Sequence, residues 1–410
     1  MKKMKLVLVG NGMAGVRTLE ELIKVAPELY EITVFGAEPH PNYNRIMLSP
    51  VLAGEQTVDE IILNPLSWYA EHGITVHLNK TVVGIDRQKR IVTADDGTQA
   101  EYDRLLIATG STPFILPVPG KDLEGVIAYR DIADTNTMID TATTHQHAVV
   151  IGGGLLGLEA ANGLALRGMQ VTVVHIAPWL MERQLDDVAA KLLQKSLEAR
   201  GLKFLLGAQT QALVGNAAGR VQSVKFKDGT EVPADLVVMA AGIRPNIGLA
   251  EKIGLHCHRG IVVTDTLQSV TDPRVYAVGE CAAHRGIAYG LVAPLFEQGK
   301  VCANHLAMHG IGRYTGSQVS TKLKVTGISL FSAGAFMGGE GTDELLLSDP
   351  FGGVYKKLVL RDDKLVGACL YGDTVDASYY FRLISEGRNV NAVRDQLMFG
   401  EASPVGAPVA

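Results

Sequence analysis

The stretch that decides the fold is "LVLVGNGMAG", residues 6–15. The apolar run Leu6–Val9 predicts a buried strand, and Gly10, Gly12 and Gly15 follow it in the spacing GxGxxG. Such a turn between a strand and a helix lets the backbone approach a pyrophosphate, which lies at the positive N-terminal end of the helix. A single GxGxxG is weak evidence, because short motifs also match by chance.

The same pattern returns in "HAVVIGGGLLGLEAANGLALRGMQVTVVH", residues 147–175. It predicts a strand over 148–151, a helix from about Leu155 to Arg167 and a second strand over 171–174. The turn between the first strand and the helix contains Gly152, Gly154 and Gly157. The length agrees with the βαβ fingerprint of dinucleotide-binding units. Two such units in one chain predict two bound dinucleotides.

Each unit has a position that reads the adenosine ribose, just past its second strand. In the first unit this is Glu38, whose carboxylate is suited to accept hydrogen bonds from both ribose hydroxyls, although it is also compatible with a solvated loop residue. In the second unit the position holds His175. A carboxylate there favours NADH and a nearby arginine favours NADPH. His175 leaves the choice open, with Arg183 the nearest downstream cation, and we favour NADH.

Three further strands end in small residues or an acid. "LLIATGS" ends in Thr109 and Gly110, and "VVMAAGIRP" ends in Gly242, which echoes it. Small residues after a buried strand permit a close approach of the backbone to a ligand. "VYAVGE" places Gly279 and Glu280 after a third strand, where the acid is suited to bond a polyol chain.

The segment "PHPNYNRIMLSPVLAG", residues 39–54, is rich in proline and asparagine and predicts a loop. It is long for a plain connection, which indicates a functional role. Its one cation, Arg45, is suited to pair with a phosphate or to stack on a ring, and an exposed arginine is the alternative.

Composition excludes several other classes of protein. With 410 residues, 47% hydrophobic and 20% charged, the chain is expected to form two or three globular domains. The net charge of −5 shows no excess of basic residues. We therefore expect no nucleic-acid partner and no basic surface that binds a membrane. The longest apolar runs are too short for a membrane span or a signal peptide, and a cytoplasmic protein is expected.

The four cysteines, Cys257, Cys281, Cys302 and Cys369, are not spaced as CxxC or CxxxxC. This spacing excludes a dithiol relay and argues against an iron–sulfur or zinc site, so no metal is expected. "TPFILPVPG", residues 112–120, contains three prolines and predicts a stiff linker. From about residue 312 the pattern changes to a hairpin with Asp362 and Asp363 at its turn, followed by a helix, which predicts a small α+β domain.

Together, the glycine sets, "LLIATGS", "MAAGIRPN" and "VYAVGECA" resemble the flavoprotein reductases with two dinucleotide-binding domains, over residues 1 to about 310. The resemblance implies an α/β protein with two Rossmann-like domains of the glutathione-reductase type and a small C-terminal α+β domain. The expected domains are 1–117 with 244–311 for FAD, 118–243 for NAD(P)H, 312–400 as an α+β interface domain, and a tail, 401–410.

The same resemblance implies roles for individual residues. Gly10, Gly12 and Gly15 would hold the FAD pyrophosphate, Glu38 the FAD ribose and Glu280 the ribitol chain. Glu159 would lie near the contact between nicotinamide and flavin. No general base or nucleophile of the protein is required, because the cofactors carry the chemistry.

Within that group, "YNRIMLSPVLAGE", "LMERQLD", "YAVGECAAHRG" and "QLMFGE" resemble the N-terminal flavoprotein region of the large subunit of assimilatory NAD(P)H nitrite reductases. In that family the subunit continues into a cysteine-rich iron–sulfur segment and a sirohaem domain, whereas this sequence stops at Ala410. We therefore expect a fragment or a free-standing reductase that passes electrons to another protein and does not reduce nitrite alone.

The expected activity is FAD-dependent oxidation of NAD(P)H, with a nitrite or nitrate reductase module as electron acceptor. One alternative is a rubredoxin or ferredoxin reductase, although those proteins carry a lysine after the serine where Pro50 follows Ser49. Another is a redox-sensing interaction protein that responds to NADH. NADH oxidases and coenzyme A–disulfide reductases need a cysteine in residues 39–54, and there is none. The oligomeric state is left open, a homodimer included.

Overall fold

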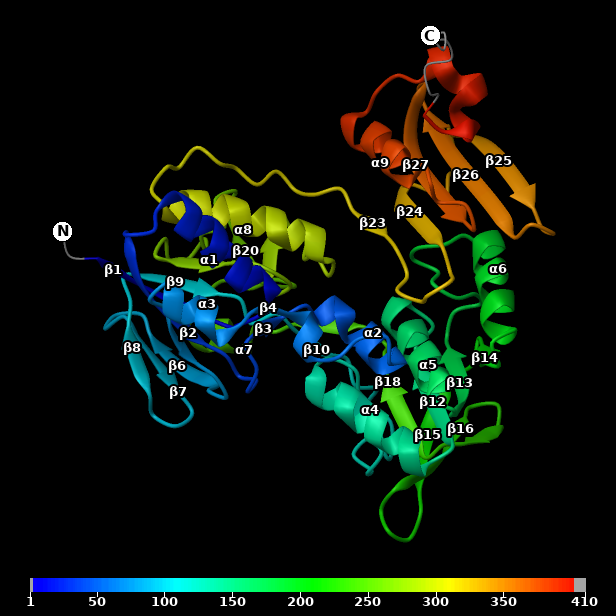
Figure 1. The fold of residues 1–410 in the computed structure, drawn as a ribbon, viewed down its shortest axis with the longest axis horizontal. Helices are drawn as coiled ribbons and strands as arrows, with labels where there is room; N and C mark the ends of the chain where they lie inside the picture. The colour runs from blue at the N-terminus through cyan, green and yellow to red at the C-terminus, as the bar shows by residue number, and fades with distance from the viewer. Residues whose placement is uncertain (1–2, 402–410) are drawn as a thin grey trace. The chain divides into compact units, whose positions relative to one another are not determined.

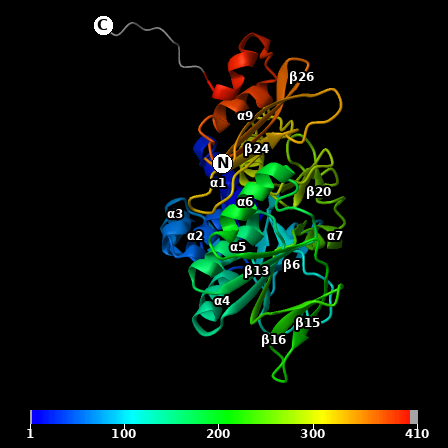
Figure 2. The ribbon, with the colours of Figure 1, turned by 90° about the vertical axis from the view of Figure 1, so that its right-hand side faces the viewer.

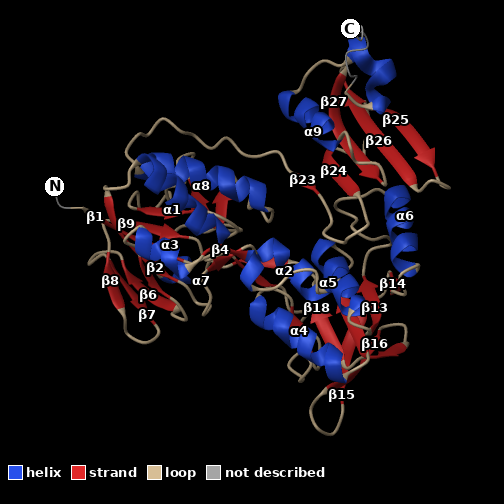
Figure 3. Ribbon diagram, viewed as in Figure 1, coloured by secondary structure: helices blue, strands red, loops and turns tan. Residues whose placement is uncertain are grey.

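The computed structural model describes residues 3–401, which form two compact units. The first unit comprises the chain up to Leu48, Thr57–Thr112 and Ile243–Ser317. The second comprises Ser49–Gln56, Pro113–Gly242 and the chain from Gln318 onward. Figures 1 and 3 show the elements of both units.

The first unit is built on a five-stranded parallel sheet with the strand order β21-β9-β1-β2-β5. Its central strand β1 carries the first apolar run, and Leu6 and Leu8 on it are fully buried. Helices α1 and α8 pack against each other beside this sheet (Figure 1). The strands are β1 (Met4–Val9), β2 (Tyr30–Phe35), β5 (Thr75–His77), β9 (Arg104–Ile107) and β21 (Val275–Ala277), and the helices are α1 (Met13–Val25) and α8 (Val292–Leu306).

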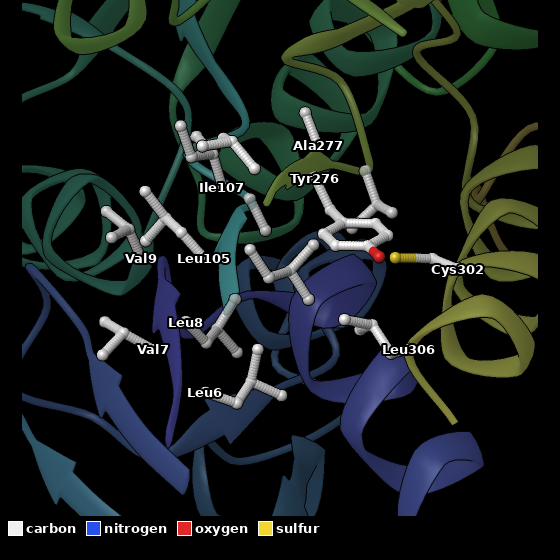
Figure 4. Packing of buried hydrophobic residues seen from close by; sticks show 14 of the residues in the cluster. Leu6, Val7, Leu8, Val9, Leu105, Ile107, Tyr276, Ala277, Cys302 and Leu306 are labelled. Atoms are coloured by element: carbon white, nitrogen blue, oxygen red, sulfur yellow. The ribbon is translucent and has the colours of Figure 1, made fainter. Parts of the chain in front are cut away.

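The core of this unit joins segments that are far apart in the sequence (Figure 4). Leu6 and Leu8 from β1, Leu105 from β9 and Tyr276 from β21 pack together with Cys302 of α8. The other elements of the unit are β3 (Asn42–Tyr43), η1 (Arg45–Met47), η2 (Asp59–Ile61), β4 (Ile62–Asn64), α3 (Leu66–Glu71), β6 (Val82–Asp86), β7 (Ile91–Ala94), β8 (Gln99–Glu101), β10 (Ser111–Pro113, which ends at the unit boundary), β19 (Ile243–Pro245), α7 (Gly248–Lys252), β20 (Ile261–Val263) and β22 (Ala282–His284).

The second unit repeats this plan with the parallel strand order β11-β18-β12-β13-β14. In both sheets the strand before the glycine set lies between its successor and a strand that ends in small residues. The internal repeat predicted from the glycines is therefore present in the topology. The parallel strands are β11 (Val126–Ala128), β12 (His147–Ile151), β13 (Gln170–His175), β14 (Lys203–Leu206) and β18 (Leu236–Met239).

Helices and an antiparallel sheet complete this part of the second unit. Figure 2 shows β15 and β16 as a long hairpin. The elements are α2 (Leu48–Ala53), α4 (Ile132–Thr144), α5 (Leu155–Leu166), α6 (Asp187–Glu198), β15 (Thr210–Gly215), β16 (Val221–Phe226) and β17 (Glu231–Pro233).

The C-terminal segment forms an antiparallel sheet with the order β23-β24-β27-β26-β25 and a helix packed on it, as an α+β fold requires. At the turn between β26 and β27, Asp362 and Asp363 both have positive φ, 50° and 55°. Two such residues characterise the tight hairpin turn that matches strand twist. The elements are β23 (Ser320–Thr321), β24 (Leu330–Gly334), β25 (Asp343–Asp349), β26 (Val354–Arg361), β27 (Lys364–Tyr371), α9 (Ala377–Glu386) and η3 (Asn391–Phe399).

The compact units divide the chain differently from the expected domains. The chain crosses between units at 112/113, 242/243 and 317/318, where the sequence suggested 117/118, 243/244 and 311/312. The C-terminal segment shares one unit with residues 113–242. The backbone N–H of Lys324 donates to Glu159 of α5, and tyrosine hydroxyls of the C-terminal sheet bond to α6 and its N-cap. Of the expected tail, residues 402–410 lie outside the described chain.

Residues 39–54 also differ from the expected loop, because they contain β3, η1 and the helix α2. Pro50 is the third residue of α2, within the first turn, where proline is tolerated. Within residues 3–401, no helix combines the length and the apolar character needed to cross a membrane.

Candidate functional site

The first glycine loop joins β1 to α1. Gly10 has a φ of +108°, and a side chain there would collide with the carbonyl oxygen of Ala108. At Gly15 a Cβ atom would lie 2.9 Å from Leu8 Cδ1, so the helix can approach the strand only with glycine. At Gly12 a Cβ atom would meet nothing within 4 Å. Packing within the protein therefore explains Gly10 and Gly15, whereas Gly12 leaves a space open to a ligand, as in the pyrophosphate turn of dinucleotide-binding units.

The second glycine loop, between β12 and α5, has the same three features. Gly152 has a φ of +129°, and a Cβ atom on it would collide with the carbonyl oxygen of Ala240. One on Gly157 would collide with the carbonyl oxygen of Gly152, and one on Gly154 would meet nothing within 4 Å. No side chain caps the N-terminus of α1 or α5, which begin after Gly12 and Gly154. The first backbone N–H groups of both helices are thus suited to an anionic ligand.

A cleft of about 410 Å³ opens beside the first glycine loop in the first unit. Thr109 lines it together with Gly10, and the Thr109 hydroxyl donates to the carbonyl oxygen of Asn246 at 2.8 Å. Gly110 follows with a positive φ of 67°. Val9, from the end of the first apolar run, also lines the cleft. No sequence motif indicated its other lining residues, which are Phe35, Ala37, Lys80, Thr81, Val82, Val83, Asn246, Gly248, Leu249 and Lys252.

Glu38 and Arg45 form one half-buried cluster with Tyr43. The Arg45 guanidinium pairs with Glu38 Oε1, and the Tyr43 hydroxyl donates to Glu38 Oε2 at 2.7 Å. Arg45 also lies over the Tyr43 ring, 5.0 Å from its centroid. Arg45 was expected to meet a phosphate or a ring, and the structure shows it on a ring and a carboxylate of the protein itself. Tyr43 begins the quoted stretch "YNRIMLSPVLAGE", but nothing in the sequence indicated its bond to Glu38.

Glu280 lies directly after Gly279, near the end of β21. The Ser111 hydroxyl donates to Glu280 Oε2 at 2.7 Å. Gly279 has a positive φ of 87°, and its N–H donates to the buried Gln298 side chain at 2.9 Å. Ser111 and Gln298 thus orient the turn that carries Glu280, and neither was identified from the sequence.

Glu159 is buried in the second unit, on α5. Its Oε2 accepts the Ser49 hydroxyl at 2.6 Å, and its Oε1 accepts the backbone N–H of Lys324 at 2.8 Å. The Tyr129 hydroxyl in turn donates to Ser49 at 3.4 Å. Burial raises the pKa of the Glu159 carboxyl, and these hydrogen bonds act in the opposite direction. Glu159 therefore joins three segments of the second unit.

His175 ends β13 and uses both ring nitrogens within the protein. Its Nδ1 accepts the backbone N–H of Gly153 at 3.1 Å, and its Nε2 lies 2.9 Å from Glu182 Oε2. The ring is 8% exposed, so it does not present a free nitrogen to a ribose. Arg183 is exposed. Gly242 has a φ of +111°, and a Cβ atom on it would meet nothing within 4 Å.

The four cysteines are all free thiols; Cys281, Cys302 and Cys369 are buried and Cys257 is partly buried. Burial raises the pKa of each of these thiols. In the part of the chain that the structure describes, no group of three or more potential ligands is placed to hold a metal ion.

Two glycine loops of the same geometry, each on a parallel α/β sheet, define an oxidoreductase that uses two dinucleotides. The chain belongs to the pyridine nucleotide-disulphide oxidoreductase family, whose model matches residues 4–321. The model of the rubredoxin NAD+ reductase C-terminal domain matches residues 320–388. The cofactors of this chain, as a member of the pyridine nucleotide-disulphide oxidoreductase family, are FAD and NAD(P)H.

Two relatives are proteins of Bacillus subtilis (strain 168). The chain is 52% identical to a nitrite reductase [NAD(P)H] over 391 residues, which cover 95% of this chain and 48% of that protein. It is 47% identical to an assimilatory nitrate reductase electron transfer subunit, over 98% of this chain and 52% of that protein. The chain thus spans about half the length of these curated relatives. A solved putidaredoxin reductase–putidaredoxin complex matches 98% of this chain and all of the matched chain, with a TM-score of 0.86 and 25% identity.

Proposed function

We propose that this chain takes electrons from NAD(P)H in its second unit, passes them to FAD in its first unit and delivers them to a separate protein. The proposed acceptor is a nitrite or nitrate reductase module of nitrogen assimilation. The observation that carries the proposal is the duplicated glycine loop in a chain whose four cysteines are all free thiols. The cysteines therefore offer no dithiol relay for the flavin's electrons, which supports direct transfer from the flavin to an external acceptor.

Residues of the first unit are suited to hold FAD. The open space at Gly12 and the uncapped start of α1 would receive the pyrophosphate, with Gly10 and Gly15 shaping the turn. Glu38, oriented by Arg45 and Tyr43, would accept the ribose hydroxyls. Glu280, held by Ser111, would bond the ribitol chain, with Thr109, Gly110 and Gly279 as close backbone neighbours. When bound, FAD would accept two electrons together from NAD(P)H and could release them one at a time.

Residues of the second unit are suited to hold NAD(P)H. Gly154 and the start of α5 would receive the pyrophosphate, on a turn shaped by Gly152 and Gly157. Gly242 offers a second open backbone position, since a side chain there would meet only space. Glu159 is proposed to lie near the nicotinamide, where its hydrogen bonds from Ser49 and Lys324 would keep the carboxyl in one orientation.

The names of the relatives support the acceptor class, because one is a nitrite reductase and the other an electron transfer subunit of nitrate reductase. A second candidate is rubredoxin, favoured by the match of residues 320–388 to the C-terminal domain of rubredoxin reductases.

The test starts from the purified holoprotein. We expect a yellow protein with about one FAD per chain that is bleached by NADH under anaerobic conditions. Reoxidation of the bleached protein is then followed with a nitrite reductase module, a nitrate reductase module, rubredoxin and ferredoxin at equal concentrations. Rapid reoxidation by the nitrite or nitrate reductase module alone supports the proposal. Rapid reoxidation by rubredoxin alone would establish the second candidate, and a colourless protein that takes up no FAD would refute both.

A further inference from the structure

We propose that Glu182, held in place by His175, recognises the adenosine ribose of NADH and discriminates against NADPH. This inference rests on the proposed assignment of the second unit to NAD(P)H. It answers a difficulty in the sequence, where the ribose-reading position holds a histidine. In the structure His175 is buried, and its Nε2 is hydrogen-bonded to the carboxylate of Glu182.

The hydrogen bonds of His175 determine its tautomer. Nδ1 accepts the N–H of Gly153, so the ring proton resides on Nε2. Nε2 therefore donates to Glu182 Oε2, at 2.9 Å. The ring thus lies between the glycine loop and the carboxylate of Glu182, with one nitrogen bonded to each.

Gly153 also positions the segment that carries Glu182. Its carbonyl oxygen accepts the N–H of Met181 at 2.9 Å, and its N–H donates to His175. Gly153 thus bonds both to His175 and to the residue that precedes Glu182. Met181 is fully buried and has a positive φ of 54°, a conformation that needs surrounding structure to maintain it. A side chain on Gly153 would come within 2.8 Å of the His175 ring, so the ring packs directly against the glycine loop. Glu182 is thus fixed one imidazole ring away from that loop.

The Glu182 side chain is 34% exposed, so its carboxylate borders solvent. Within the described chain the bond from His175 is the one hydrogen bond it accepts, which leaves Oε1 available. A carboxylate beside the pyrophosphate turn accepts hydrogen bonds from the ribose 2′-hydroxyl and repels a 2′-phosphate. The chemistry thus selects NADH although the motif position itself holds no acid.

The adjacent Arg183 is the competing determinant, because an arginine at this place accommodates a 2′-phosphate. It is exposed and follows the anchored segment directly. The two side chains predict opposite preferences, and a binding measurement distinguishes them.

The test is isothermal titration of the FAD-loaded protein with NAD⁺ and with NADP⁺. We expect the wild-type protein to bind NAD⁺ at least tenfold more tightly. Glu182→Gln should reduce that preference by about tenfold to a hundredfold, the range for losing one hydrogen bond to a charged group. His175→Phe, which keeps the ring volume over Gly153 but removes both nitrogens, should reduce the preference in the same direction. The matched control is Glu198→Gln, an exposed glutamate at the end of α6, which should leave both affinities unchanged.

Unchanged affinities in Glu182→Gln would overturn the inference, as would a wild-type preference for NADP⁺, which would assign the discrimination to Arg183. If the wild-type protein bound neither nucleotide, the assignment of the second unit to NAD(P)H would itself fail. Normal binding of NAD⁺ without an effect of Glu182→Gln would leave that assignment intact and refute the role of Glu182 alone.

Discussion

Ser49 donates a 2.6 Å hydrogen bond to the carboxylate of Glu159, which lies 110 residues further along the chain. The other carboxylate oxygen accepts the backbone N–H of Lys324. Glu159 was expected only as a neighbour of the nicotinamide, yet it joins α2, α5 and the loop between β23 and β24 of the C-terminal sheet. Its structural role can be measured separately from any role toward a cofactor.

Replacing Glu159 by leucine should destabilise the protein more than replacing it by glutamine. Leucine leaves the Ser49 hydroxyl and the Lys324 N–H without an acceptor, at a cost of about 1–3 kcal/mol for each buried group. Glutamine keeps one carbonyl acceptor, and the Ser49 hydroxyl can rotate to accept from its amide. Urea unfolding measures the difference, with the exposed Glu198→Leu as control. Equal stability of the Leu and Gln variants would contradict the network.

The Glu159 carboxyl also predicts a dependence of stability on pH. Because burial raises its pKa in the folded state above the usual 4.5, folding favours the protonated form. Its contribution is fully present below about pH 4.5 and is lost as pH rises through the raised pKa. The free energy of unfolding of the wild type relative to Glu159→Gln should therefore be larger at pH 5 than at pH 8. Urea titrations of both proteins at the two pH values check this, and a difference that grows with pH would show that the pKa is lowered.

The glycines of each loop should separate into two functional classes. Gly12→Ala and Gly154→Ala introduce a Cβ atom into open space, so the fold should persist while binding of the dinucleotide at that loop weakens. Gly10→Ala and Gly152→Ala introduce a collision with a carbonyl oxygen at positive φ and should destabilise the protein itself.

For the first loop, the ratio of flavin absorbance to protein absorbance and the thermal unfolding midpoint give both readouts. Full FAD content in Gly12→Ala would show that the open space does not serve the cofactor. For the second loop, titration with NAD⁺ replaces the flavin ratio, and Gly154→Ala should raise the dissociation constant at least tenfold.

Asp186 connects helix α6 to the C-terminal sheet. One carboxylate oxygen caps α6 by accepting the N–H of Ala189, and the other accepts the Tyr355 hydroxyl at 2.7 Å. Tyr355→Phe should cost about 1.5–3 kcal/mol, as expected for a buried hydrogen bond to a charged group. Asp186→Ala should cost more, because the cap is lost as well.

A double-mutant cycle of these two changes should show coupling, since the residues are in contact. Tyr379→Phe, at a half-buried tyrosine of α9 whose ring faces Arg382, is the control and should change the free energy of unfolding by less than about 0.5 kcal/mol. Additive costs in the cycle would show that the Tyr355 hydroxyl and Asp186 do not stabilise each other.

Local patterns of the sequence predicted most of the secondary structure near the site. The strand expected over 148–151 is observed as β12 (His147–Ile151), and the helix expected from Leu155 to Arg167 ends one residue earlier, at Leu166. Strands and helices follow from periodicity and from glycine at fixed offsets, which act over a few residues. Residues 39–54 were misread as a loop, because Pro50 disfavours a helix interior but is accepted in the first turn of α2.

By itself, the sequence determined that the protein has two dinucleotide-binding βαβ units and a third α+β segment, since glycine spacing and apolar runs are local properties. The partners of the polar side chains were decided by the tertiary structure alone. Glu159 bonds to Ser49 and Lys324. Glu38 bonds to Arg45 and Tyr43. The ring of His175 bonds to Glu182. These contacts depend on the path of the backbone in space and on which side chains are buried together. Glu182 belongs to the quoted stretch "LMERQLD", but only the structure shows that its carboxylate bonds to His175.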